Sequence, residues 1–184
     1  ATMSLSARDL VGVVVFNSDA DVVVPLAPNK DPQRTADAIR RISPDGGTNL
    51  APGLELAHGM LERATAKVRH IVVMTDGQSV NPELLPGLAK EIASGGIRIT
   101  TIGVGDGADA TGLDAIARAG GGKYYQVRDP NVLPRVFLKA VRVERQPLVR
   151  EGLFDPVMNP VGSPMIAGLG KPPSLSGLSL TQAR

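Results

Sequence analysis

The chain has 184 residues, of which 42% are hydrophobic and 21% charged, and its formal net charge is +2. This length and composition are ordinary for one globular domain with a short appendage. The absence of cysteine excludes disulfides, thiolate metal sites and cysteine nucleophiles. Aromatic residues are only 3% of the chain, which predicts an aliphatic core and argues against stacking platforms for single-stranded nucleic acid.

Positive and negative residues are interspersed along most of the chain. The basic residues between 135 and 150 are expected to form a solvated helix face, with a surface for an anionic partner as the alternative. No apolar run reaches the ~18 residues of a membrane span. We therefore expect no nucleic-acid binding and no membrane contact by this segment itself.

The first part of the chain predicts a β-hairpin followed by two helices. A valine-rich run at 11–16 and a second extended run at 20–26 are joined by turn residues, which implies antiparallel pairing. Pro25 places the second strand at a sheet edge. Asp31-Pro32 begins a helix whose apolar face extends to Ile42. Apolar residues at steps of four and three predict a further helix over 50–64.

The middle of the chain alternates between strands and helices. Strands are predicted at 69–75, 97–104 and 123–127, and helices begin at Asn81-Pro82, Asp109 and Asp129-Pro130. This alternation predicts a mostly parallel sheet with right-handed crossovers. The expected fold class is α/β, a doubly wound, Rossmann-like sheet with one antiparallel edge hairpin.

The composition changes after residue 146, where six of the 15 prolines lie. We expect a domain over residues 1–145 and, over 146–184, a Pro/Gly-rich extension or the start of a second domain. Residues 148–154 are a candidate strand, and the remainder is predicted to be a linker.

The strand at 69–75 is a continuous apolar run that predicts burial on both faces, and it ends in Asp76-Gly77. Ligands of open α/β sheets bind just beyond the carboxyl ends of the strands. Thr48 lies in a glycine-flanked loop on the same rim. A hydroxyl and a carboxylate are hard oxygen donors, which suit Mg²⁺ or Mn²⁺ better than Zn²⁺. The simpler alternatives are that Asp76 is a turn residue capping the next loop and that Thr48 or Asn49 caps a helix.

Five ordered blocks of this sequence resemble the von Willebrand factor type A domains, over about residues 5–142. They are the strand ending in Thr75-Asp76-Gly77, the loop at 46–49, the strand before the hairpin at 11–16, the segment 101–105, and Gly-Gly-Lys-Tyr-Tyr at 121–125 followed by Asp-Pro and a helix. The resemblance implies a doubly wound sheet with a metal-ion-dependent adhesion site. Thr48 matches the metal ligand of its second loop and Asp76 that of its third.

The resemblance further implies that the metal accepts a carboxylate from a protein partner, so that the function is metal-bridged adhesion or complex assembly and not catalysis. The alternative is a structural scaffold domain with a vestigial metal site. In bacterial proteins this kind of domain often belongs to a membrane-anchored chain, which suggests an extracytoplasmic location, although the residues do not fix the compartment.

One part of the family pattern is absent. No Asp-x-Ser-x-Ser occurs, and Thr2-x-Ser4-x-Ser6 has the spacing without the carboxylate. We expect residues 1–9 to be the tail of the family's first helix, with the first strand and the main metal loop missing. The metal site would then be incomplete and unoccupied. A missing central strand leaves free backbone edges, so we expect rearrangement or an intertwined homodimer in which the hairpin or the C-terminal tail fills the gap.

Two rival interpretations remain. Gly103-x-Gly105-x-x-Ala108, with Asp129 further on, has the form of a dinucleotide fingerprint, but the acidic residues beside it would repel a pyrophosphate. An enzyme would need a second catalytic group beside Asp76. No serine sits in a nucleophile elbow, and both His58 and His70 are expected to be structural. Hydrolase activity is therefore not expected.

Overall fold

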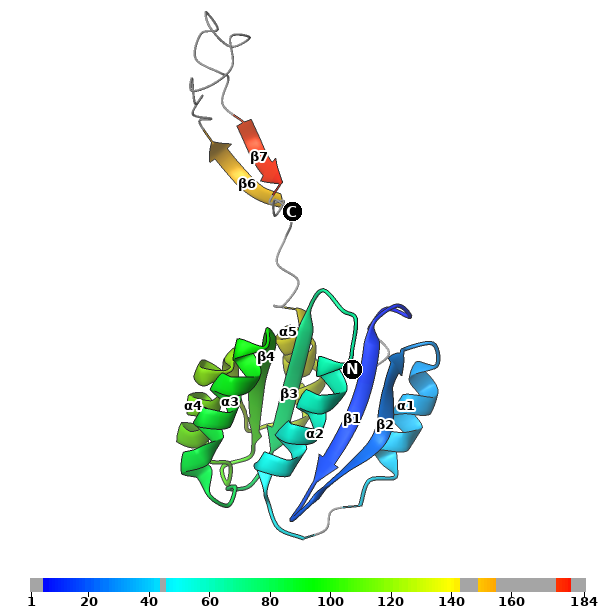
Figure 1. Ribbon diagram of the computed structural model, residues 1–184, viewed down its shortest axis with the longest axis vertical. Coiled ribbons are helices and arrows are strands. Elements are labelled where there is room, and N and C mark those ends of the chain that lie inside the picture. The colour runs from blue at the N-terminus through cyan, green and yellow to red at the C-terminus, as the bar shows by residue number, and fades with distance from the viewer. Residues whose placement is uncertain (1–4, 44–45, 143–148, 155–174, 180–184) are drawn as a thin grey trace, which may run out of the picture. The chain divides into compact units, whose positions relative to one another are not determined.

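The computed structural model describes residues 5–43, 46–142, 149–154 and 175–179 (Figure 1). The chain divides into two compact units, Ala1–Glu144 and Arg145–Arg184. In the second unit, β6 (Val149–Phe154) pairs antiparallel with β7 (Leu175–Ser179). The candidate strand at 148–154 is thus confirmed, whereas β7 lies in a segment predicted to be a linker. Its short leucine–serine alternation gave little signal among the surrounding prolines and glycines.

The first unit begins with an antiparallel hairpin of β1 (Leu10–Phe16) and β2 (Ala20–Pro28). Asn17 closes the turn, because its side-chain oxygen accepts the Asp19 N–H at 2.9 Å. Among the described residues β2 pairs only with β1, so the strand that carries Pro25 is an edge strand as predicted.

The first helix, α1 (Pro32–Arg40), begins as the sequence predicts. The Asp31 carboxylate accepts the Arg34 N–H at 3.0 Å, and Pro32 occupies the first turn. The helix ends earlier than expected. Ile42 therefore lies beyond it and is exposed instead of extending the apolar face.

Three parallel strands form the second sheet, in the order β3 (Arg69–Thr75), β4 (Ile97–Val104) and β5 (Gly121–Val127). They alternate with α2 (Leu50–Glu62), α3 (Leu85–Ser94), α4 (Ala110–Ala119) and α5 (Leu133–Arg142). The expected α/β class, with a mostly parallel sheet and an antiparallel hairpin, is confirmed.

The core lies mainly between this sheet and the helices α2, α3 and α4. Its fully buried side chains are almost all aliphatic, as the composition predicted: Leu50, Leu54, Ile71, Val73, Leu85, Ala89, Ile92, Ile97, Ile99, Leu113 and Ile116. A smaller cluster on the α5 side contains Ile102, Val127 and Ala140. Along β3 only alternate residues are fully buried. Burial on both faces was therefore wrong for this strand, because the α5 side is covered less completely.

Two helices begin one turn later than predicted, for the same reason. Asn81-Pro82 opens the 3₁₀ turn η2 (Pro82–Leu84) before α3, and Asp129-Pro130 opens η3 (Pro130–Val132) before α5. In each case a second proline, four residues after the first, could not donate the N–H that a continuous α-helix needs there. Asn81 has a left-handed φ of 46° and makes no side-chain cap bond, so the side chain of this residue does not cap the turn that it precedes.

Helix α4 ends at the glycine run 120–122, with Gly120 at its C-cap. The next strand, predicted to begin at Lys123, begins earlier, because β5 starts at Gly121. A Cβ atom on Gly122 would overlap the Ile99 carbonyl, so only glycine permits β5 to approach β4 at this point.

The two sheets of the first unit are separate, because among the described residues no strand lies between β1 and β3. Helix α2 spans the break and packs on β1, β2 and β3 (Figure 1). The approach to β1 is close at Gly53, where an added Cβ would lie 3.2 Å from the Phe16 side chain.

Replacing His70 by glutamine is expected to reduce the loss of stability in acid. Burial, and secondly the charge of Arg98, lower the pKa of His70 from 6.5 to about 4. Its Nε2 atom is buried without a hydrogen-bond partner among the described residues. Because the unfolded chain takes up this proton at higher pH than the folded chain, stability falls as the pH drops from 6.5 towards 4, by up to about 3 kcal/mol.

Urea unfolding at about pH 7.5 and about pH 4.5 measures this effect, since the difference between the two proteins at the higher pH reports packing alone. The wild-type protein should lose about 2–3 kcal/mol more than His70→Gln between the two conditions. Equal losses in both proteins would contradict the assignment.

Candidate functional site

The candidate site lies at the rim where β1 and the parallel strands end. Four short segments meet there: the hairpin turn at 17–19, the loop at 46–49, the loop at 76–81 after β3, and the loop at 105–109 after β4. The Asn49 N–H donates to the Asn17 carbonyl at 2.7 Å, and the Val80 N–H donates to the Thr48 carbonyl at 2.9 Å. These bonds fix the loop that carries Thr48 against both the hairpin and the end of β3.

Thr48 and Asp76 lie in directly contacting loops, as the sequence predicted for one rim. Gly77, next to Asp76, packs so closely on Thr48 that an added Cβ would lie 2.9 Å from the Thr48 Oγ1. The loop after β4 also reaches this point, because a Cβ on Gly107 would lie 3.0 Å from the Asp76 carbonyl oxygen. Thr48 is half-buried, and Asp76 is exposed.

The side-chain oxygens of Thr48 and Asp76 form no polar contacts with the rest of the described residues. Within the described part of the chain, neither the Thr48 hydroxyl nor the Asp76 carboxylate makes a hydrogen bond or an ion pair. The Gly77 N–H is satisfied by the Thr75 hydroxyl at 3.3 Å. Asp76 therefore does not act as the cap of the next loop, which was the simpler alternative for it.

The N-terminus of α2 is capped from another loop. Asn49 has the extended backbone of an N-cap residue but makes no capping bond with its side chain. Its Nδ2 instead donates to the Ser18 carbonyl at 3.3 Å. The Leu50 N–H donates to the Ser79 Oγ at 3.0 Å. Capping by Thr48 or Asn49, the alternative for this loop, is thus absent, and Ser79 takes that role.

The donors present fit a divalent metal in kind but not in number. A hydroxyl and a carboxylate are oxygen ligands of the type that Mg²⁺ and Mn²⁺ prefer, yet Mg²⁺ requires about six ligands in octahedral geometry. Within the residues that the structure describes, no three His, Asp or Glu side chains gather closely enough to hold a metal ion. Two protein donors would leave the remaining positions to water or to groups from outside these residues.

The loop after β4 does not have the properties of a dinucleotide site. Gly105 has a left-handed φ of 73°, but the α4 N-terminus is already capped by Asp109, whose carboxylate accepts the Gly112 N–H at 3.0 Å. The local charge is negative as well. Burial first, and then the charges of Asp109 and Asp114, raise the pKa of Tyr124. A pyrophosphate would be repelled from a helix end that a carboxylate already occupies.

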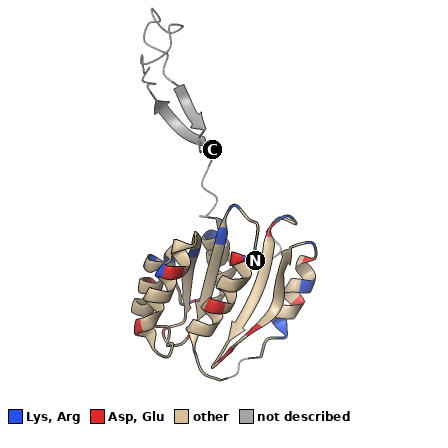
Figure 2. Ribbon diagram, in the orientation of Figure 1, with Lys and Arg blue, Asp and Glu red and all other residues tan. Residues whose placement is uncertain are grey.

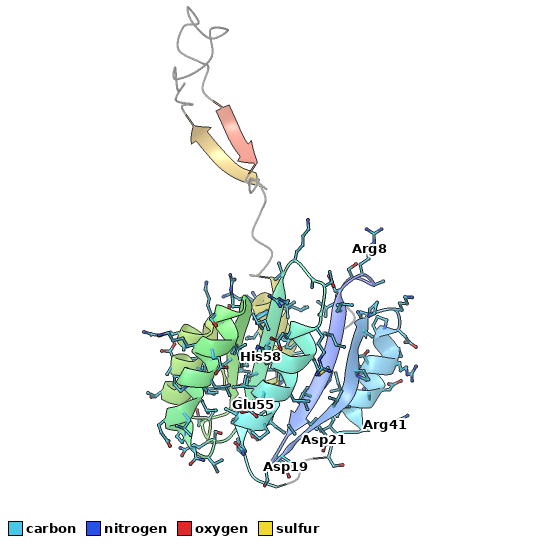
Figure 3. The ribbon with its side chains drawn as sticks, in the orientation of Figure 1. Arg8, Asp19, Asp21, Arg41, Glu55 and His58 are labelled. Atoms are coloured by element: carbon cyan, nitrogen blue, oxygen red, sulfur yellow. The ribbon has the colours of Figure 1, made fainter. Side chains whose placement is uncertain are left out.

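The two histidines lie away from the rim loops that hold Thr48 and Asp76. His58 is half-buried on α2, where Figure 3 shows it beside Glu55 on the side turned towards the viewer. His70 lies at the opposite end of β3 from Asp76. No hydrogen bond links either histidine to a serine or carboxylate among the described residues.

The charged side chains of the first unit are interspersed in sign, as Figure 2 shows. Arg135 is exposed, and the Lys139 ammonium lies 5.7 Å from the centre of the Tyr125 ring. This part of the predicted basic helix face is therefore solvated, and Arg145 and its neighbours lie outside the described residues. None of the described helices combines the length and apolar character that a membrane span requires.

Comparisons with known proteins identify the family. The family model for the von Willebrand factor type A domain matches residues 4–139. A protein of Borreliella burgdorferi is 28% identical over 141 residues, and one of Synechocystis is 29% identical over 132 residues. These alignments cover 73% and 69% of this chain but only 40% and 31% of the relatives, so the chain spans well under half of their length.

Solved structures show the same fold. A von Willebrand factor type A protein from Catenulispora acidiphila has a TM-score of 0.70 at 25% identity, covering 84% of this chain and 39% of that one. An aerotolerance-related membrane protein from Bacteroides fragilis has a TM-score of 0.65 at 22% identity, covering 77% and 83%. Proximal thread matrix protein 1 of the mussel byssus, solved with a zinc-occupied MIDAS motif, has a TM-score of 0.62 at 22% identity, covering 72% and 34%.

Gly77→Ala is expected to destabilise the protein by about 1–3 kcal/mol, because the new methyl group would overlap the Thr48 hydroxyl and force the two rim loops apart. Gly59→Ala on α2 is the matched control, since a Cβ there meets nothing within 4 Å. That change should raise stability by about 0.5–1 kcal/mol through helix propensity. Urea unfolding of both variants gives the comparison. A neutral or stabilising effect of Gly77→Ala would show that the loops are not in close contact.

Proposed function

Because this chain belongs to the von Willebrand factor type A domain family, we propose that it is a non-catalytic protein-binding domain of the adhesion type. Thr48 and Asp76 would supply a hydroxyl and a carboxylate to a divalent cation, and a carboxylate of a protein partner would bind at an open position of that cation. Domains of this family are typically interaction or adhesion modules and are generally not enzymes.

One observation carries the proposal. The backbone around Thr48 and Asp76 is fixed by hydrogen bonds between loops, while both side-chain oxygens remain without a partner among the described residues. A purely structural threonine or aspartate at a helix start or a strand end would be expected to cap the adjacent N–H groups. Those N–H groups are instead satisfied by Ser79 and Thr75, which leaves the two donors available to a ligand.

The proposed cation is Mg²⁺ or Mn²⁺, because both donors are hard oxygens. The mussel byssus protein has zinc at its MIDAS motif, so Zn²⁺ belongs among the ions to be tested. With two donors from the described residues, we propose that the site is incomplete and binds its ion weakly. The alternative, a scaffold domain with a vestigial metal site, predicts no specific binding at all.

A second part of the proposal concerns the free strand edges. The β1 and β3 edges that face the break carry backbone N–H and C=O groups without a paired strand, and such edges favour pairing with another chain. We propose that two copies of this chain form an intertwined dimer in which the hairpin or the C-terminal unit of one copy closes the break in the other.

We also propose an extracytoplasmic location for this domain, as part of a membrane-anchored protein. The likeness to a Bacteroides membrane protein is compatible with that location.

The metal proposal is tested by electron paramagnetic resonance of free Mn²⁺. The wild-type chain should bind Mn²⁺ with a dissociation constant on the order of 1 mM, and Asp76→Asn and Thr48→Val should abolish that binding. Glu55→Gln, which removes an exposed charge from α2, is the matched control and should leave the binding unchanged. Binding that persists in Asp76→Asn would remove Asp76 from the site. Micromolar Mg²⁺ affinity by titration calorimetry would contradict an incomplete site.

The dimer proposal is tested by sedimentation velocity and amide hydrogen exchange. We expect a dimer, with slow exchange at those β3 amides that donate no hydrogen bond to β4. A monomer in which the same amides exchange rapidly would contradict pairing across the break.

A further inference from the structure

Ser79 makes one of the hydrogen bonds that join the two halves of the candidate site, and it makes that bond with its side chain. It lies in the loop after β3, three residues beyond Asp76, yet its Oγ accepts the Leu50 N–H at the start of α2, at 3.0 Å. The same hydroxyl donates to the Val80 carbonyl at 3.1 Å. Because this donation uses the one hydroxyl proton, the oxygen lone pairs are left to accept from Leu50. The hydroxyl is thereby held in a fixed orientation.

A second bond runs between the same two loops in the opposite direction. The Val80 N–H donates to the Thr48 carbonyl at 2.9 Å. The two bonds flank Thr48, one at its own carbonyl and one two residues later at Leu50. Gly77 packs on the Thr48 side chain as well. Two hydrogen bonds and one close contact therefore hold the segment that carries Thr48 against the Asp76 loop.

The side chain that caps the N-terminus of α2 comes from the loop after β3 and not from the N-cap residue itself. An N-cap asparagine normally accepts an N–H of the first helical turn. Here the Asn49 side chain donates to the hairpin turn at Ser18 instead, and Ser79 satisfies the Leu50 N–H. A local cap would secure only the helix, whereas a cap from the loop after β3 also fixes the separation of Thr48 and Asp76.

We propose that Ser79 is a positioning residue that preassembles Thr48 and Asp76 as one unit, without itself binding the cation. This inference rests on the proposed metal-binding function and extends it to a residue that is not one of the proposed ligands. It implies that half of the site is ordered before any ion or partner arrives, so that binding does not have to order these loops.

The test compares Ser79→Ala with Ser79→Thr, which keeps the hydroxyl. Ser94→Ala is the matched control, because it removes an exposed serine whose hydroxyl donates to the Glu91 carbonyl within α3. Two quantities are measured for each protein: the hydrogen-exchange rate of the Leu50 amide, and the affinity for Mn²⁺ alone by electron paramagnetic resonance. Loss of one hydrogen bond should accelerate Leu50 exchange about tenfold in Ser79→Ala, and Mn²⁺ affinity should fall about three- to tenfold. Ser79→Thr should restore both, and Ser94→Ala should change neither.

The possible results are distinguishable. Unchanged Leu50 exchange in Ser79→Ala would overturn the connection itself. Faster exchange with unchanged Mn²⁺ affinity would show that Ser79 is only a helix cap, and would also overturn the proposal. If the wild-type chain binds no Mn²⁺, the proposed metal function fails and with it the positioning role, while the exchange measurement still decides whether the loops are joined through Ser79.

Discussion

The position of helix α2 is the constraint on which the rest of the first unit depends. The hairpin and the parallel sheet share no backbone ladder within the described residues, so α2 connects them by packing on β1, β2 and β3. Gly53 allows the helix to approach Phe16 closely. The start of the same helix is tied to the hairpin turn through Asn49 and to the end of β3 through Ser79. A shift of the α2 N-terminus would therefore disturb the contacts that hold the Thr48 segment beside the Asp76 loop.

This arrangement links the architecture of the unit to its proposed chemistry. In a parallel sheet the strand ends and helix starts share one rim, and the loops there contribute side chains to ligands. Here backbone groups of those loops bond to one another or to the hydroxyls of Ser79 and Thr75, and the side-chain oxygens of Thr48 and Asp76 remain without partners among the described residues. The fold thus fixes the positions of the Thr48 hydroxyl and the Asp76 carboxylate while leaving both free of intramolecular hydrogen bonds among the described residues. A ligand-binding site requires both properties.

Much of this could be predicted from local sequence signals. The β3 strand and its closing Asp76-Gly77 were evident from an apolar run followed by turn residues, and the hairpin from its short connection. The start of α1 followed from Asp31-Pro32, because that cap is made within four residues of chain. Pairing Thr48 with Asp76 on one rim required only the general topology of an α/β sheet, together with the family resemblance.

What could not be predicted depends on contacts between distant residues. The cap of α2 comes from Ser79, 29 positions from Leu50, and nothing near Asn49 indicates that its side chain turns to the hairpin instead. The late starts of α3 and α5, by contrast, could have been predicted from the sequence, since Pro86 and Pro134 each follow a first proline by four residues. The glycine run at 120–122 ends α4, with Gly120 at its C-cap, but the further role of Gly122, a close approach to Ile99, appears only once the strands are paired.

The central claim is that Thr48 and Asp76 together present oxygen donors to a divalent cation. The most direct measurement is paramagnetic line broadening in NMR spectra during a Mn²⁺ titration, because the effect falls steeply with distance from the ion. The account predicts that the Thr48 methyl group and the Asp76 and Gly77 signals broaden before any others. Earlier broadening at the hairpin turn, where Figure 3 shows Asp19 and Asp21, or at Asp106 and Asp109, would place the ion elsewhere and contradict the claim.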